Sequence, residues 1–146
     1  MKLEFIKTGD VKIPSKAHTT DAGLDFFVPN DFEPLILWPG DDVKIDSYIK
    51  IEVPAGWSLV FFNKSGIATN MKLIVGAQVI DSGYRGNVHI HVFNAGVEPV
   101  KIMPGQKIVQ GLLLQVPTVE LIETTTFSAD PSSERGDGGF GSTGVQ

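Results

Sequence analysis

Cysteine is absent from the 146-residue sequence, which excludes disulfide bonds and thiolate metal sites. Long hydrophobic runs are also missing, because no stretch approaches the roughly 20 apolar residues that span a bilayer. Arginine is scarce: Arg85 and Arg135 are the only two, and the formal net charge is −5. An acidic chain lacks the broad basic face that non-specific nucleic-acid binding requires. We therefore expect a soluble protein that contacts neither membrane nor nucleic acid and holds any anionic ligand by locally placed cations.

Short runs that alternate apolar and polar residues dominate the chain, as at 43–46 and 88–93, and a period of two is typical of half-buried strands. Denser apolar runs predict strands buried on both faces at 35–38, 59–62 and 112–114. Glycine and proline separate these runs closely. The only helix expected is a short piece from Ser65 to Met71. The pattern predicts one all-β domain, arranged as a sandwich, jelly roll or barrel.

The last part of the chain differs in composition from the rest. From Ser128 onward it is polar and rich in glycine, so it can bury little surface and loses much backbone entropy on ordering. This change predicts a β domain over residues 1–128 and a flexible arm over 129–146. A floppy terminus would explain the composition, but an arm that orders over a ligand also fits. Its candidate ligand contacts are Arg135, Phe140, Gly141, Ser142 and Thr143.

Two segments combine charge with tight turns in ways that suit a phosphate ligand. Asp21 and Asp25 flank Gly23, which is either ordinary turn chemistry or a carboxylate placed near a magnesium–triphosphate. Asn63-Lys64-Ser65-Gly66 follows an apolar run, and a strand leading into a Ser-Gly turn points backbone N–H groups outward. The lysine adds a charge and the serine a hydroxyl donor. The spacing is not that of a Walker loop, so this segment is not diagnostic by itself.

Two further segments place polar side chains beside predicted strands. Val79 to Asn87 is predicted to form a hairpin around a Ser-Gly turn, with Asp81 at the end of its first strand. A carboxylate there could orient and partly deprotonate an attacking water, although a plain turn cap is the alternative. The segment from Pro104 reads as a turn followed by a strand, on which Lys107 and Gln110 are candidate phosphate or scaffold contacts.

Taken in order, these five segments resemble the five signature motifs of the dUTP diphosphatase (dUTPase) family, in its homotrimeric branch. The resemblance runs from about Asp21 to Gly144 and is strongest over Arg135 to Gly144. It implies a distorted jelly roll or β-sandwich of the β-clip type, with a C-terminal arm that closes over the nucleotide. It also implies Mg²⁺-dependent hydrolysis of dUTP to dUMP and pyrophosphate in a homotrimer with shared active sites. The expected location is the cytoplasm, or the host cytoplasm or nucleus if the source is a virus.

The resemblance also implies a role for each matching residue. Asp81 orients the water that attacks the α-phosphorus, Tyr84 packs on the deoxyribose to exclude ribonucleotides, and Asp25 acts mainly through waters around Mg²⁺. The backbone of the hairpin around Val75 to His89 reads the base edge, and the arm grips the γ-phosphate and covers the base. Three chains build each site: one supplies Asp25 and the phosphate contacts, a second the hairpin, and a third the arm. The expected phosphate contacts outside the arm are Lys64, Ser65, Gly66, Lys107 and Gln110.

Some positions depart from the family pattern. Lysines replace common arginines in two motifs, keeping the charge but losing the bidentate fork. Gln78 stands where a glycine is common in the base-reading hairpin, and we expect its side chain to point away; if it points in, dCTP or a modified pyrimidine becomes a candidate substrate. Deamination is disfavoured, because residues 87–94 contain no glutamate base. A non-catalytic jelly-roll binding module is the remaining alternative. His89 and His91 are expected to make ordinary polar or inter-subunit contacts.

Overall fold

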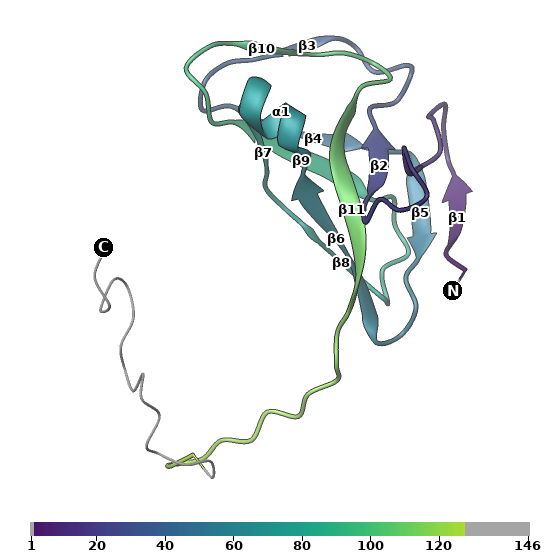
Figure 1. Cartoon of the computed structure of the whole chain (residues 1–146), viewed down its shortest axis with the longest axis vertical. Coiled ribbons are helices and arrows are strands. Elements are labelled where there is room, and N and C mark those ends of the chain that lie inside the picture. The colour runs from purple at the N-terminus through teal and green to yellow at the C-terminus, as the bar shows by residue number, and fades with distance from the viewer. Residues whose placement is uncertain (1, 128–146) are drawn as a thin grey trace.

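The structure, a computed structural model, describes residues 2–127, which form eleven short strands and one helix (Figure 1). In chain order these are β1 (Glu4–Lys7), β2 (Leu24–Phe27), β3 (Leu35–Leu37), β4 (Asp42–Asp46), β5 (Ile49–Glu52), β6 (Trp57–Asn63), α1 (Ser65–Asn70), β7 (Leu73–Val75), β8 (Val79–Asp81), β9 (His89–Asn94), β10 (Val100–Ile102) and β11 (Lys107–Gln115). The turns that follow prolines contain Gly40, Gly56 and Gly105, each with a positive φ that favours glycine. The helix predicted from Ser65 to Met71 is confirmed, ending one residue earlier.

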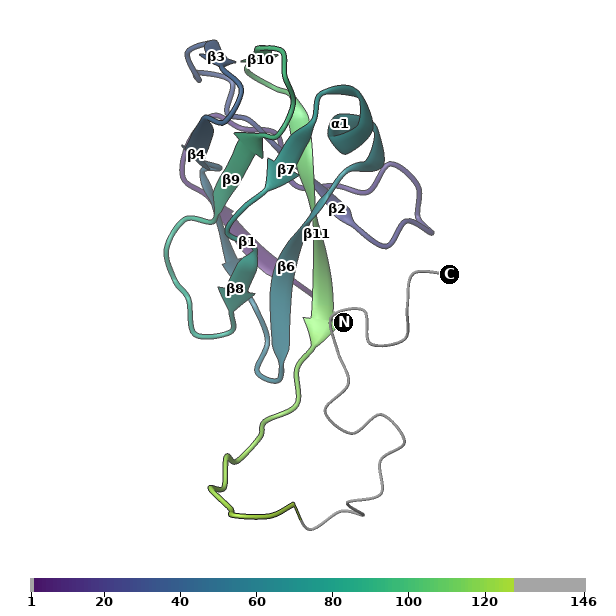
Figure 2. The same cartoon turned by 90° about the vertical axis from the view of Figure 1, so that its left-hand side faces the viewer.

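The strands pair antiparallel throughout the described residues and form two main sheets with two smaller ribbons. The larger sheet has the order β2-β11-β6-β8, and the smaller has the order β4-β9-β7. The ribbons pair β1 with β5 and β3 with β10. Figure 2 shows β6 and β11 running side by side through the body. The predicted all-β, jelly-roll-like fold is confirmed.

The core is built from the inward side chains of both main sheets. Leu59 and Phe61 of β6 and Ile90 and Val92 of β9 are buried, and they alternate with less buried neighbours. The Phe61 ring meets the Phe26 ring edge to face, with centroids 4.8 Å apart. Each fully buried side chain of this size contributes roughly 1.5–3 kcal/mol. The period of two in the sequence therefore gives the strands an inner and an outer face.

The prediction that three apolar runs are buried on both faces is wrong. Ile36, Phe62 and Leu114 are 52%, 38% and 38% exposed, although Leu37 and Phe61 beside them are buried. β3 belongs to a two-stranded ribbon, and Phe62 and Leu114 lie next to the last residues of their strands. A second layer therefore does not cover these positions within the described residues.

The hairpin predicted around Ser82-Gly83 is also wrong. β8 pairs with β6, whereas β9 pairs with β4 and β7, so the two strands belong to different sheets. Residues 82–88 are therefore a crossing between sheets rather than a hairpin turn. The predicted position of Asp81, at the end of the first strand, is confirmed.

The chain leaves the body after β11 as an extended segment, residues 116–127 (Figure 1). Val116 N donates to the Gly56 carbonyl at 2.8 Å, but Leu121 and Phe127 are 94% and 91% exposed. Residues 129–146, including the predicted contacts Arg135, Phe140, Gly141, Ser142 and Thr143, lie outside the described residues. Within the described part, no helix has the length and apolar character to cross a membrane.

Candidate active site

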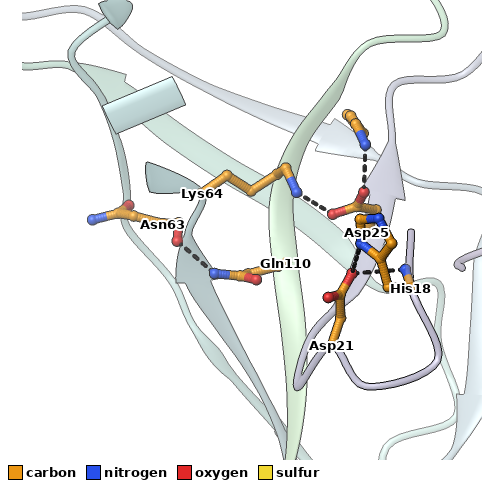
Figure 3. A network of polar contacts seen from close by, with 7 residues as sticks. His18, Asp21, Asp25, Asn63, Lys64 and Gln110 are labelled. Carbon is orange, nitrogen blue, oxygen red and sulfur yellow. Dashed lines mark hydrogen bonds and ion pairs between the residues drawn. The ribbon is translucent and has the colours of Figure 1, made fainter. Parts of the chain in front are cut away.

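Asp25 is a buried carboxylate that two ammonium groups contact (Figure 3). It is 6% exposed; the Lys107 Nζ lies 2.9 Å from its Oδ2, and the Lys64 Nζ contacts its Oδ1. The Lys64 and Lys107 side chains remain 21% and 49% exposed. Asp25 balances one of the two ammonium charges of this lysine pair, so these three side chains together carry a charge of +1, and the Asp21 carboxylate lies near enough to interact with Asp25.

The strand register explains why these side chains meet although they are far apart in the sequence. Asp25 lies opposite Gln110 in the ladder between β2 and β11, and β6 on the other side of β11 ends just before Lys64. Gln110 Nε2 donates to the Asn63 carbonyl at 2.9 Å. A Cβ at Gly23 would lie 2.6 Å from Gln110 Oε1, so this glycine leaves the space that Gln110 occupies.

The ionisation of Asp25 follows from two opposing effects. Burial acts to raise the pKa of Asp25, but the hydrogen bonds and charges of Lys64 and Lys107 outweigh it and hold the pKa below its usual value. The carboxylate is therefore ionised at neutral pH. The neighbouring Asp21 accepts a hydrogen bond from the His18 backbone N–H at 2.9 Å, which likewise lowers the pKa of Asp21.

Ser65 and Gly66 lie beside this cluster at the start of α1. Lys64 is the N-cap residue in extended conformation, and Ser65 and Gly66 are both exposed. A Cβ at Gly66 would meet no other atom within 4 Å, so this backbone faces open space. The structure thus brings together Asp25, the two lysines, the start of α1 and Gln110, and their predicted roles toward phosphate and Mg²⁺ remain predictions.

Asp81, Tyr84 and Gln78 lie around a separate cavity of about 180 Å³. The lining residues are Ala77, Gln78, Val79, Ile80, Asp81, Tyr84, Val88 and His89. Asp81 is exposed, and its carboxylate forms no hydrogen bond within residues 2–127. Its oxygens can therefore accept a hydrogen bond from a bound water.

Tyr84 is held by the loop that carries it. Its hydroxyl donates to the Asn87 carbonyl at 2.9 Å, and its N–H donates to the Asp81 carbonyl at 3.1 Å. A Cβ at Gly86 would lie 2.4 Å from the Tyr84 hydroxyl oxygen, so the ring needs glycine at this position. Arg85 donates to the Ser82 carbonyl at 2.9 Å, which closes the same loop.

The lysine pair and the cavity lie toward opposite ends of β6. Asp81 is opposite Ser58 near the start of the strand, whereas Lys64 follows its last residue, Asn63. Five residues of extended strand span on the order of 17 Å. Within one chain, the two groups are thus too far apart to contact the same phosphate.

The sequence analysis gave no role to the individual side chains of Asn63, Ala77 or His89, although Asn63 belongs to a predicted motif and the other two lie within the backbone expected to read the base. Asn63 Oδ1 accepts a hydrogen bond from Val75 N at 2.8 Å, while its carbonyl accepts one from Gln110. Ala77 and His89 line the cavity. The adjacency of Asn63 to Lys64 was the available signal for the first; the other two depend on how β7, β8 and β9 meet.

A metal ion held by protein groups alone does not fit the described residues. No group of three or more His, Asp or Glu side chains among them could hold an ion. Asp25, the predicted metal residue, already contacts both lysines. A single carboxylate fits the different case of Mg²⁺ carried by phosphates, in which the ion keeps several waters.

Comparison with known proteins agrees with the resemblance found in the sequence. The sequence model of the dUTPase family matches residues 9–144. A deoxyuridine 5'-triphosphate nucleotidohydrolase from Gloeobacter violaceus is 36% identical over 134 residues, covering 90% of this chain and 88% of that protein. A variant of the Staphylococcus bacteriophage 80alpha dUTPase, solved with dUpNHpp, has a TM-score of 0.86 at 26% identity and covers 99% of both chains.

A second solved structure extends the likeness of fold. A variant dUTPase from phage phi11 of S. aureus, which coordinates a structural Mg(II) ion, has a TM-score of 0.80 at 22% identity. The match covers 88% of this chain and 100% of that one, and at this identity it supports the fold alone. The family match, the identity to its members and the shared fold lead to one conclusion: this chain belongs to the dUTPase family.

Proposed function

We propose that this chain hydrolyses dUTP to dUMP and pyrophosphate, with Asp81 orienting the water that attacks the α-phosphorus. The observation that carries the proposal is the cavity that combines Tyr84 and Gln78 with the Asp81 carboxylate, which has no hydrogen-bond partner among residues 2–127, in a member of this family. A carboxylate that accepts a proton from a positioned water makes that water a better nucleophile. Tyr84 packs against the deoxyribose, where a 2′-hydroxyl would clash with its ring.

The lysine pair is proposed to bind the phosphates. Lys64 and Lys107 supply positive charge, and Ser65, Gly66 and Gln110 supply hydrogen-bond donors beside them. Their contact with Asp25 supports this role, because it fixes two otherwise flexible side chains in place. Bound Mg²⁺ would neutralise part of the triphosphate charge, with Asp25 contacting its waters. The arm would add Arg135, Ser142 and Thr143 at the γ-phosphate and Phe140 with Gly141 over the base.

We further propose a homotrimer in which subunits share each site. The distance between Asp81 and Lys64 along β6 supports sharing, because a nucleotide at Asp81 needs its phosphate contacts from a second chain. Residues 116–127 support assembly independently: Leu121 and Phe127 are almost fully exposed, and such apolar groups gain stability on a partner's surface. A cytoplasmic location and the base-closing role of the arm remain predictions.

A panel of nucleotides tests the substrate. Pyrophosphate release with Mg²⁺ should be at least about tenfold faster from dUTP than from dCTP or UTP. A mispaired buried base edge costs about 1–3 kcal/mol with dCTP, and the 2′-hydroxyl of UTP would clash with Tyr84. Equal rates across the panel would contradict the assignment. A preference for dCTP would instead favour the second candidate, a related pyrimidine pyrophosphatase in which Gln78, a residue of the cavity wall, contacts the base.

The Asp81→Asn variant tests the mechanism separately. Asparagine keeps the shape of the side chain but cannot accept the proton, so kcat should fall by about two orders of magnitude or more. Binding of a non-hydrolysable dUTP analogue should change little, because Asp81 contacts the water rather than the phosphates. A variant that keeps full turnover would show that another group activates the water.

A further inference from the structure

His91 uses both ring nitrogens to connect the smaller sheet to the wall of the cavity. Its Nε2 lies 3.0 Å from Asp42 Oδ2 on the neighbouring strand β4. Its Nδ1 accepts a hydrogen bond from the Ala77 backbone N–H at 2.9 Å. The His91 side chain is 29% exposed and the Asp42 side chain 64% exposed, so the imidazole is partly shielded while the carboxylate that it contacts faces solvent. Ala77 and the adjacent Gln78 line the cavity.

These contacts define the tautomer of the imidazole. A backbone N–H can only donate, so Nδ1 must present its lone pair to Ala77. The neutral ring then carries its proton on Nε2, where it donates to the Asp42 carboxylate. Asp42 thereby selects the one neutral form of His91 that can hold Ala77, because a partner on one ring nitrogen fixes the state of the other.

The segment that His91 holds connects the two main sheets. Residues 76–78 leave β7 in the smaller sheet and enter β8 in the larger one. Gly76 N donates to the His91 carbonyl at 2.9 Å, and Phe61 N donates to the Gln78 carbonyl at 2.8 Å. Between these two backbone anchors, the Ala77 N–H donates to the His91 side chain, its one partner in the described part of the chain. Because a peptide unit is planar, fixing this N–H fixes the plane of the Gly76–Ala77 peptide as well.

Gly76 provides a second, independent observation. A Cβ at this position would lie 2.1 Å from His91 Nδ1 and 2.5 Å from the ring carbon Cε1. Gly76 does not have a positive φ, so backbone conformation is not the reason for glycine here. The glycine is explained by the close approach of the imidazole, which shows that the ring and the segment fit each other closely.

We propose that His91, oriented by Asp42, is a positioning residue that sets the cavity wall at Ala77 and Gln78 and so contributes to selection of the pyrimidine base. This inference rests on the proposed function, in which this cavity takes the base. His91 does not line the cavity, so it acts through the backbone that does. Losing it frees one peptide plane to rotate, which weakens base discrimination without removing Asp81 or the phosphate contacts.

A pair of substitutions separates this role from simple packing. In His91→Asn the side-chain Oδ1 takes the place of Nδ1 and can still accept from Ala77. In His91→Gln the polar atoms lie one bond farther out, near the Nε2 position, so the Ala77 N–H loses its partner. His18→Gln is the matched control, since His18 and Asp21 form the other His–Asp pair of the described residues and His18 is 80% exposed.

The readouts are kcat and KM for dUTP and dCTP, together with the melting temperature of each variant. We expect His91→Gln to lower the ratio of kcat/KM for dUTP over dCTP by about fivefold, the effect of one lost hydrogen bond. The change should appear mainly in the KM values, and kcat for dUTP should stay within about twofold of the wild-type value. His91→Asn and His18→Gln should stay near the wild-type ratio. Equal ratios for both His91 variants, or an unchanged ratio in His91→Gln, would overturn the proposal.

The tautomer is tested without activity. Side-chain ¹⁵N NMR of the wild-type protein should find the proton of the neutral His91 ring on Nε2, and Asp42→Ala should change that signal. A proton on Nδ1 would overturn the proposal. If His91 has the expected tautomer but the wild-type enzyme does not prefer dUTP, the result counts against the proposed function instead. Failure of the His91 proposal and failure of the proposed function can therefore be told apart.

Discussion

Replacing Asp25 by asparagine should destabilise the fold by about 2 kcal/mol at neutral pH. The variant keeps the shape of the side chain but leaves Lys64 and Lys107 facing one another without a counter-charge. Removing one partner of a fully buried ion pair costs about 3–5 kcal/mol, and an exposed pair is worth about 0–1 kcal/mol. Asp25 is buried while the lysines are 21% and 49% exposed, which places the expected value between these limits.

The pH dependence of this difference has a definite sign. The lowered pKa of Asp25 means that its ionised form stabilises the native state fully above the unfolded pKa, near 3.8, and less as pH falls through the native pKa. Asparagine does not titrate. The difference in unfolding free energy between the wild type and Asp25→Asn should therefore be constant above about pH 5 and become smaller below about pH 4.

Urea unfolding measures both the loss of stability at neutral pH and its change with pH. The protein concentration is kept fixed, because assembly would otherwise make the stability depend on it. Asp21→Asn is the control: Asp21 also has a lowered pKa but lies at the surface, so its replacement should leave the transition nearly unchanged. A stability of Asp25→Asn equal to that of the wild type, or a gap that widens on acidification, would refute the reasoning.

Three shorter predictions concern the cavity, the lysine pair and the arm. Gly86→Ala should displace the Tyr84 ring, whose hydroxyl oxygen would lie 2.4 Å from the new Cβ, and raise the relative rate with UTP in a dUTP–UTP competition assay. Lys64→Met should raise KM for dUTP about tenfold or more, because a charge-assisted phosphate contact is worth roughly 1.5–3 kcal/mol; an unchanged KM would exclude a phosphate contact. Deleting residues 135–146 should reduce turnover severely and leave the melting temperature almost unaffected, whereas a large drop would assign the arm a structural role.

The sequence by itself determined the fold class, the turns and the membership of the family. Alternation with a period of two predicted β9 correctly, because this strand has one face toward the core and the other away from it. Pro-Gly pairs predicted turns that the positive φ values of Gly40 and Gly105 confirm. Motif order and residue type also identified the lysine pair, Gln110 and Asp81 as the polar groups of interest.

Only the tertiary structure decided which strands are neighbours. The chain from β8 to β9 was predicted to be a hairpin because a Ser-Gly turn lies between two apolar runs, a local signal. The actual pairing is non-local: β8 completes the sheet of β6, and β9 lies between β4 and β7. That difference puts the Asp81 cavity at the junction of the two sheets and brings His91 to the Ala77 backbone. Hydrogen bonds between distant strands depend on how the sheets pack, and no local pattern of residues specifies that.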